Sequence, residues 1–199
     1  MRRFLAFALA VGLPSLGLPQ GTVNFANNVP FQTPDPTGGM RLVYLCGPFD
    51  PSGPTALKGT NYAAELYYGP AGSLQPLPSS IRRFRPLTTL QPGTWNPSPD
   101  PFVTLPGINI GDTTTLQVKV WDLNIFPAYE LALAGGGMAL QSAPFWYTVP
   151  PPGSDPSAYF MEGLEAFAAI TCPEPAAMAL SFLSIAILLL ARTRHRPCA

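Results

Sequence analysis

The sequence predicts an all-β protein whose body is a single β-sandwich, of jelly-roll or immunoglobulin-like type, with one short helix. Three observations support this fold class. Apolar residues alternate with polar ones at a period of two along several segments, which is typical of half-buried strands. The 199 residues include 26 Pro and 18 Gly, a density that excludes long helices. Hydrophobic residues make up 47% of the chain, enough for a packed core.

The clearest predicted strand is Thr115–Val120, in which Leu116, Val118 and Val120 share one face. Further strands are predicted over Tyr62–Tyr68, before Gly69-Pro70, and over Phe145–Val149, before a run of three prolines. Weaker alternation indicates four more strands, at 22–26, 41–46, 102–105 and 163–170.

One short helix is predicted over Ala128–Ala134. Pro127 suits the first turn of a helix, and Gly135-Gly136-Gly137 ends whatever precedes it. A helix of this length is unstable alone and must pack on a sheet.

Residues 1–20 are predicted to be a helical signal peptide. Arg2 and Arg3 precede a charge-free apolar run, Phe4–Leu13, which Pro14 and small residues follow. These features predict export by the general secretion machinery and cleavage by signal peptidase, with residues 21–172 as the exported domain.

Residues 176–191 form a second apolar stretch, predicted to be a transmembrane helix. At about 1.5 Å per residue it spans ~24 Å, and snorkelling arginines extend its reach toward a ~30 Å hydrocarbon core. Arg192, Arg194 and Arg196 lie in the tail, 192–199, that follows it. Because positive residues stay on the cytoplasmic side, the arginines at both ends of the chain place everything between the two stretches outside the cytoplasm.

Pro173-Glu174-Pro175, followed by an apolar span and an arginine-rich tail, resembles the PEP-CTERM sorting signal of exported bacterial proteins. The resemblance covers residues 173–199. It implies recognition by an exosortase, a membrane-embedded transpeptidase-like enzyme, and release or attachment at the cell surface, often in bacteria that make exopolysaccharide. The tail here continues past its arginines through His195 to Ala199, which departs from the usual pattern.

The composition of the body excludes several function classes. Residues 21–172 hold six Lys/Arg against ten Asp/Glu, so the body lacks the basic surplus that is typical of nucleic-acid-binding proteins. The chain's single histidine, His195, lies in the tail, which excludes Ser-His-Asp and Cys-His catalysis and most zinc sites from the body. We therefore expect no catalytic residues, metal or cofactor. Cys46 and Cys172 are either free or paired in a disulfide.

Carbohydrate binding is an alternative function. Alternation places Tyr67 and Trp121 opposite the apolar faces of their strands, where exposed rings stack on sugars. Arg83, in the cluster Arg82-Arg83-Phe84-Arg85, is a candidate contact for an anionic polysaccharide, and a solvated loop is the plainer interpretation. A weaker alternative, a carboxylate-based glycosidase, rests on Glu162 and Glu165, three positions apart. The first hypothesis remains a non-enzymatic exported protein with a structural or adhesive role at the cell surface or in the extracellular polysaccharide.

Overall fold

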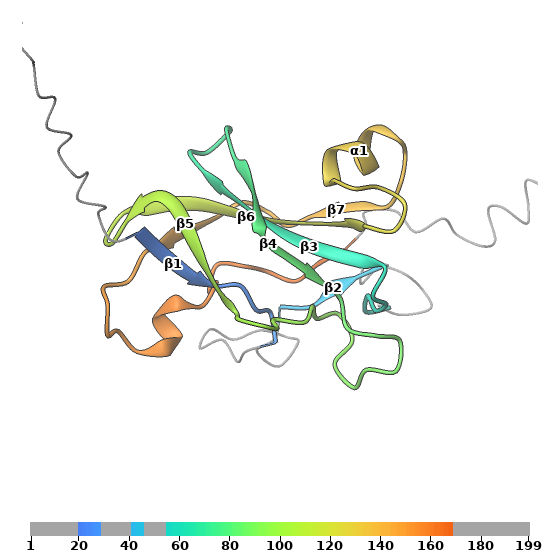
Figure 1. The fold of residues 1–199 in the computed structure, drawn as a ribbon, viewed down its shortest axis with the longest axis horizontal. Coiled ribbons are helices and arrows are strands. Elements are labelled where there is room, and N and C mark those ends of the chain that lie inside the picture. Colours follow the sequence, from blue (N-terminus) through green and yellow to red (C-terminus); the bar gives the residue numbers. More distant parts are fainter. Residues whose placement is uncertain (1–19, 29–40, 46–54, 169–199) are drawn as a thin grey trace, which may run out of the picture.

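The computed structural model describes residues 20–28, 41–45 and 55–168, and they form an all-β structure with one short α-helix (Figure 1). The predicted helix is confirmed as α1 (Tyr129–Ala134), and a 3₁₀ turn, η1, covers Pro156–Tyr159. The strands are β1 (Gln20–Asn24), β2 (Val43–Tyr44), β3 (Tyr62–Gly69), β4 (Gln75–Arg83), β5 (Phe102–Asn109), β6 (Thr113–Asp122), β7 (Ala139–Gln141), β8 (Phe145–Thr148) and β9 (Phe167–Ala168).

β6 is the central strand of a five-stranded antiparallel sheet. β3 pairs along one edge of β6, from Tyr62 opposite Asp122 to Gly69 opposite Thr115, and β4 extends the sheet beyond β3. The other edge of β6 is shared by two short strands, β8 at its start and β7 near its end. Two further pairs complete the β structure, an antiparallel β1–β5 ribbon and a parallel β2–β9 pair.

The main hydrophobic core lies on one face of the five-stranded sheet. Leu116, Val118 and Val120 of β6 point into it, as their alternation predicts. Side chains of the β1–β5 ribbon, including Val23 and Leu105, belong to the same buried cluster. The core therefore joins the large sheet to the small ribbon.

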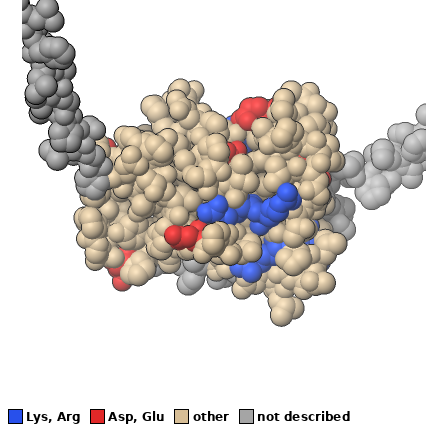
Figure 2. All heavy atoms as spheres, viewed as in Figure 1, with Lys and Arg blue, Asp and Glu red and all other residues tan. Residues whose placement is uncertain are grey.

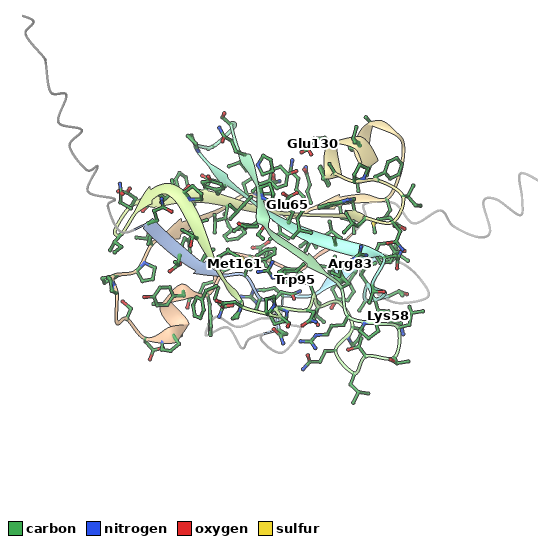
Figure 3. All side chains as sticks on the ribbon, in the orientation of Figure 1. Lys58, Glu65, Arg83, Trp95, Glu130 and Met161 are labelled. Atoms are coloured by element: carbon green, nitrogen blue, oxygen red, sulfur yellow. The ribbon has the colours of Figure 1, made fainter. Side chains whose placement is uncertain are left out.

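Trp95 occupies the centre of this core and is fully buried (Figure 3). Its ring stacks on Phe25 at 4.9 Å between centroids and meets the edge of Phe84 at 6.1 Å. Its Nε1 donates to the backbone oxygen of Phe25 at 3.0 Å, which satisfies the one polar atom of the side chain.

Asn27 is a buried polar residue that joins three segments distant in sequence. Its Nδ2 donates to the backbone oxygens of Arg41, at 2.8 Å, and Gly93, at 2.9 Å. Its Oδ1 accepts from the backbone nitrogen of Trp95 at 3.2 Å. Gly93 has a φ of 78°, and a Cβ there would lie 3.1 Å from the Val43 oxygen. The close approach of these two backbone segments therefore requires a glycine.

The opposite face of the large sheet is covered by α1. Ala63 of β3 and Trp121 of β6 form a second buried cluster with Tyr129 and Ala132 of the helix. Trp121 is 0% exposed and its Nε1 donates to the backbone oxygen of Phe126 at 2.9 Å. The predicted exposure of Trp121 and Tyr67 is therefore wrong: the alternation is as predicted, but both faces of the strands are covered here.

Residues 1–19 of the predicted signal peptide, the predicted transmembrane helix, the Pro-Glu-Pro motif and both body cysteines lie outside the described residues, and Gln20, the last residue of the predicted signal peptide, begins β1. Within residues 20–28, 41–45 and 55–168, no helix is long and apolar enough to cross a bilayer.

Candidate functional site

Five polar and aromatic residues gather on the sheet face beneath α1, and we call them the Glu65 cluster. Glu65 and Tyr67 come from β3, Lys119 comes from β6, and Tyr129 and Glu130 come from α1. Glu65 and Lys119 are direct cross-strand partners, which puts their side chains on the same face. Figure 3 shows Glu130 at the helix and Glu65 deeper, toward the sheet.

The contacts within the Glu65 cluster are short and converge on Glu130. The Tyr67 hydroxyl donates to Glu130 Oε1 at 2.8 Å, and Lys119 Nζ lies 3.3 Å from the same oxygen. Lys119 Nζ also lies 3.8 Å from the centre of the Tyr67 ring and 4.6 Å from that of Tyr129. The ammonium group is thus held between two aromatic faces and one carboxylate, a combination of cation–π and ionic attraction.

Glu65 is the buried acid of the cluster, with 4% of its surface exposed. Burial, and after it the nearby negative charge of Glu130, raise the pKa of its carboxyl from 4.5 to about 7. Lys119 and a hydrogen bond with Tyr67 act in the opposite direction but are outweighed. The Glu65 carboxyl therefore keeps its proton to a higher pH than an exposed glutamate does.

The pKa of Glu130 is shifted in the opposite direction. Partial burial alone would raise its pKa, but the hydrogen bond from Tyr67 and the approach of Lys119 outweigh it and lower the pKa below 4.5. Burial and the hydrogen bond to Glu130 raise the pKa of Tyr67, so this phenol remains a donor at physiological pH. The pKa values of the two carboxyls of the cluster are thus shifted in opposite directions, and Tyr67 interacts with both.

A pair of carboxyls with separated pKa values is typical of acid–base catalysis. Here the Glu130 oxygen is already used by Tyr67 and Lys119, and Glu65 is almost inaccessible. The same contacts fasten α1 to the sheet. The geometry therefore favours a structural role for the pair, and the described residues contain no group of three or more His, Cys, Asp or Glu suited to a metal ion.

The three predicted glycan contacts do not share a surface. Tyr67 is buried in the Glu65 cluster and Trp121 is buried beneath α1. Arg83 is exposed at the end of β4, where its Nη1 donates to the backbone oxygen of Thr60 at 2.5 Å and to Asn124 Oδ1 at 3.2 Å. Only Arg83 of the three is accessible to a ligand.

The two carboxylates predicted for glycoside hydrolysis do not lie on a helix. Glu162 and Glu165 are both exposed and follow η1 in a turn and loop, so the helix that would align them is absent from this described segment. Asp122 shapes a turn, because its Oδ1 accepts from the backbone nitrogen of Asn124 at 3.0 Å.

Positive charge gathers around the end of β4 (Figure 2). We call Lys58, Arg82, Arg83 and Arg85 the basic group. Arg82 donates to the backbone oxygens of Ser79, Ile81 and Asp100, and Arg85 Nε donates to Thr94 Oγ1 at 3.1 Å. These bonds use neutral acceptors, so they orient the guanidinium groups without neutralising them.

Trp146 is a surface aromatic that lies on β8. It is 73% exposed, whereas the other two tryptophans are fully buried. Its position between Phe145 and Tyr147, which share the buried face of the strand, places it on the opposite, exposed face.

No protein-family model matches this chain, and neither a curated protein nor a solved structure matches it. The likeness of residues 173–199 to the PEP-CTERM signal therefore remains a prediction from the sequence.

Proposed function

We propose that this chain is a non-enzymatic exported protein, displayed at the cell surface or in the extracellular polysaccharide, where it has a structural or adhesive role. Residues 1–20 direct its export. Residues 176–191 hold the precursor in the inner membrane, and an exosortase recognises Pro173, Glu174 and Pro175. The observation that carries the proposal is the pair of apolar stretches, each flanked by arginines on the side expected to stay in the cytoplasm.

The body suits this role as a β-sandwich. One layer is the five-stranded sheet, and the β1–β5 ribbon contributes to the other through the shared core. Supporting this packing, the Tyr147 hydroxyl of β8 donates to the backbone oxygen of Thr22 in β1 at 2.6 Å. Such a body supplies a compact, ordered module for display.

We propose that the chain is not an enzyme because of the contacts that its polar groups make. The body has no histidine, and the carboxyl pair beneath α1 is engaged in fastening the helix. The proposed function therefore depends on the surface of the body and on its location outside the cytoplasm.

A reporter fusion tests the sorting proposal. Residues 173–199 are appended to a periplasmic reporter and expressed with and without an exosortase. We expect membrane-bound reporter without the enzyme, and shortened, released or surface-attached reporter with it. The matched control Glu174→Gln should remain membrane-bound in both hosts. A reporter that stays soluble in both hosts contradicts the proposal.

Carbohydrate binding remains the second candidate, and Trp146 is the observation that favours it. An exposed indole beside the Thr113–Thr148 hydroxyl pair, whose oxygens lie 2.8 Å apart, offers both a stacking face and hydrogen-bonding groups. Arg83 stays a candidate contact at a separate place on the surface.

If the chain binds carbohydrate, Trp146→Ala is expected to lower retention on immobilised exopolysaccharide by up to about ten-fold without changing the fold. Leu131→Ala, which removes another exposed apolar side chain, is the control. Arg83→Ala should weaken binding only to anionic polysaccharides. Equal retention of all four proteins would remove this candidate.

A further inference from the structure

The loop that follows β4 presents two leucines to solvent. Leu87 is 68% exposed and Leu90 is 98% exposed, and both lie between Pro86 and Pro92. Figure 1 shows this green loop projecting from the body on the side opposite α1. Leucines exposed together in one projecting loop, rather than scattered singly over the surface, indicate a candidate interaction surface.

The base of the loop is firmly held. Gly59 donates its backbone N–H to Arg85 at 2.8 Å, and Asn96 donates its own to Arg83 at 2.9 Å. Phe84 and Trp95, which bridge the two sides of the base, are buried in the core. The leucines are thus carried on an anchored platform.

The loop itself is also ordered by internal hydrogen bonds. Thr89 donates its backbone N–H to the Pro86 oxygen at 3.0 Å, and Thr94 Oγ1 donates to the Gln91 oxygen at 2.8 Å. These bonds satisfy backbone groups that would otherwise resist transfer from water to an apolar phase.

The basic group surrounds this base. Arg83 and Arg85 are partners in the hydrogen bonds of the base, Arg82 is adjacent, and Lys58 precedes Gly59. Figure 2 shows Lys and Arg side chains gathered above the projecting loop, and Figure 3 labels Lys58 and Arg83 in that region. The acidic neighbour Asp100 uses its Oδ1 to accept from the Phe102 nitrogen at 2.9 Å.

The basic group holds most of the unneutralised positive charge of the described residues. Of the other two basic side chains in those ranges, Lys119 is ion-paired with Glu130, and Arg41 is only 6% exposed. Among the described residues, exposed leucines and unneutralised cations therefore occur together at one place, which is this loop and its base.

We propose that residues 86–92 form a membrane-docking loop, in which Leu87 and Leu90 enter the interface of a bilayer whose anionic headgroups contact the basic group. A bilayer supplies both required chemistries, an apolar phase for the leucines and negative charge for the cations. An anionic polysaccharide supplies only the charge, since aliphatic leucines give no stacking face to a sugar ring. This inference goes beyond the sorting proposal and does not need the C-terminal span.

α1 supplies an internal comparison. Leu131 and Leu133 are exposed on it, at 53% and 60%, but their neighbour is the acidic Glu130 and the nearby Lys119 is ion-paired. If apolar exposure alone caused docking, the two sites would behave alike. If the basic group is required, only the loop docks.

The test uses the full chain reconstituted with vesicles of phosphatidylcholine, with or without phosphatidylglycerol. In Leu90→Trp, quenching of the added tryptophan by lipids brominated on their acyl chains reports insertion, after subtraction of the signal of the unmodified chain. We expect strong quenching with phosphatidylglycerol and weak quenching without it. The matched control Leu133→Trp should show little quenching in either case.

Charge variants complete the test. Lys58→Gln with Arg85→Gln in the Leu90→Trp background should reduce insertion at low salt by about five-fold per charge removed. Equal quenching at positions 90 and 133 would overturn the proposal. So would an equal response of Leu90→Trp to a soluble anionic polysaccharide, which would indicate glycan binding instead. Flotation of the chain with both kinds of vesicle reports the C-terminal anchor separately, so failure of the loop and failure of the anchor are distinguishable.

Discussion

Trp95→Ala is expected to lower the free energy of unfolding by about 3–5 kcal/mol, the range for deleting a fully buried aromatic side chain. The substitution removes the stacking on Phe25 and the edge contact with Phe84, and it leaves the Phe25 oxygen without its indole donor. Because a domain of this size has a total stability of only about 5–15 kcal/mol, the variant should lose a substantial fraction of it.

Circular dichroism during urea unfolding measures this effect without relying on tryptophan fluorescence. Trp146→Ala is the matched control, since it deletes the same side chain at a position that is 73% exposed. Its stability should change by less than about 0.5 kcal/mol. Similar losses in the two variants would show that Trp95 is not the centre of the core.

Most strands were predictable because their two faces differ. In β6, the alternation of Leu116, Val118 and Val120 with polar residues identified both the strand and its core face. The short helix was predictable for another reason, because Pro127 and the glycine triplet limit it on both sides.

β4 could not be predicted because its ladder is irregular. It contains Pro76 and Pro78, and its pairing with β3 shifts between Ala64 and Leu66. At that shift the Ser80 hydroxyl accepts from the Leu66 nitrogen at 2.8 Å, so a side chain replaces a backbone partner. β7 was missed because three residues are too few to show alternation.

The candidate site was harder to predict than the fold. Tyr67 and Trp121 were assigned to the correct face, but sequence patterns do not show that α1 folds back over that face. The partnership of Glu65 with Lys119 depends on strand register, and the partnership of Tyr67 with Glu130 depends on helix docking, 63 positions away. Neither leaves a local signal.

Glu65→Gln is expected to stabilise the protein at alkaline pH by about 3 kcal/mol and to leave its stability nearly unchanged near pH 4.5. The folded-state pKa of Glu65, about 7, lies above the value of 4.5 that the side chain has when unfolded. The folded protein therefore binds this proton more tightly than the unfolded chain does. Its contribution to stability is fully present below pH 4.5 and is lost as the pH rises to about 7.

Urea unfolding of both proteins from pH 4 to pH 9 measures the difference, with Glu162→Gln as the control at an exposed carboxyl. The Glu65→Gln curve should diverge from the unmodified one between pH 4.5 and 7 and remain parallel to it above pH 7. Parallel curves over the whole range would contradict the raised pKa of Glu65.

Glu130 has the opposite linkage: its lowered pKa contributes stability above pH 4.5 that is lost in more acidic solution. Because these two carboxyls oppose each other, their combined contribution is largest near the ordinary value of 4.5 and declines in both directions, and Glu65→Gln should broaden that maximum toward neutral and alkaline pH.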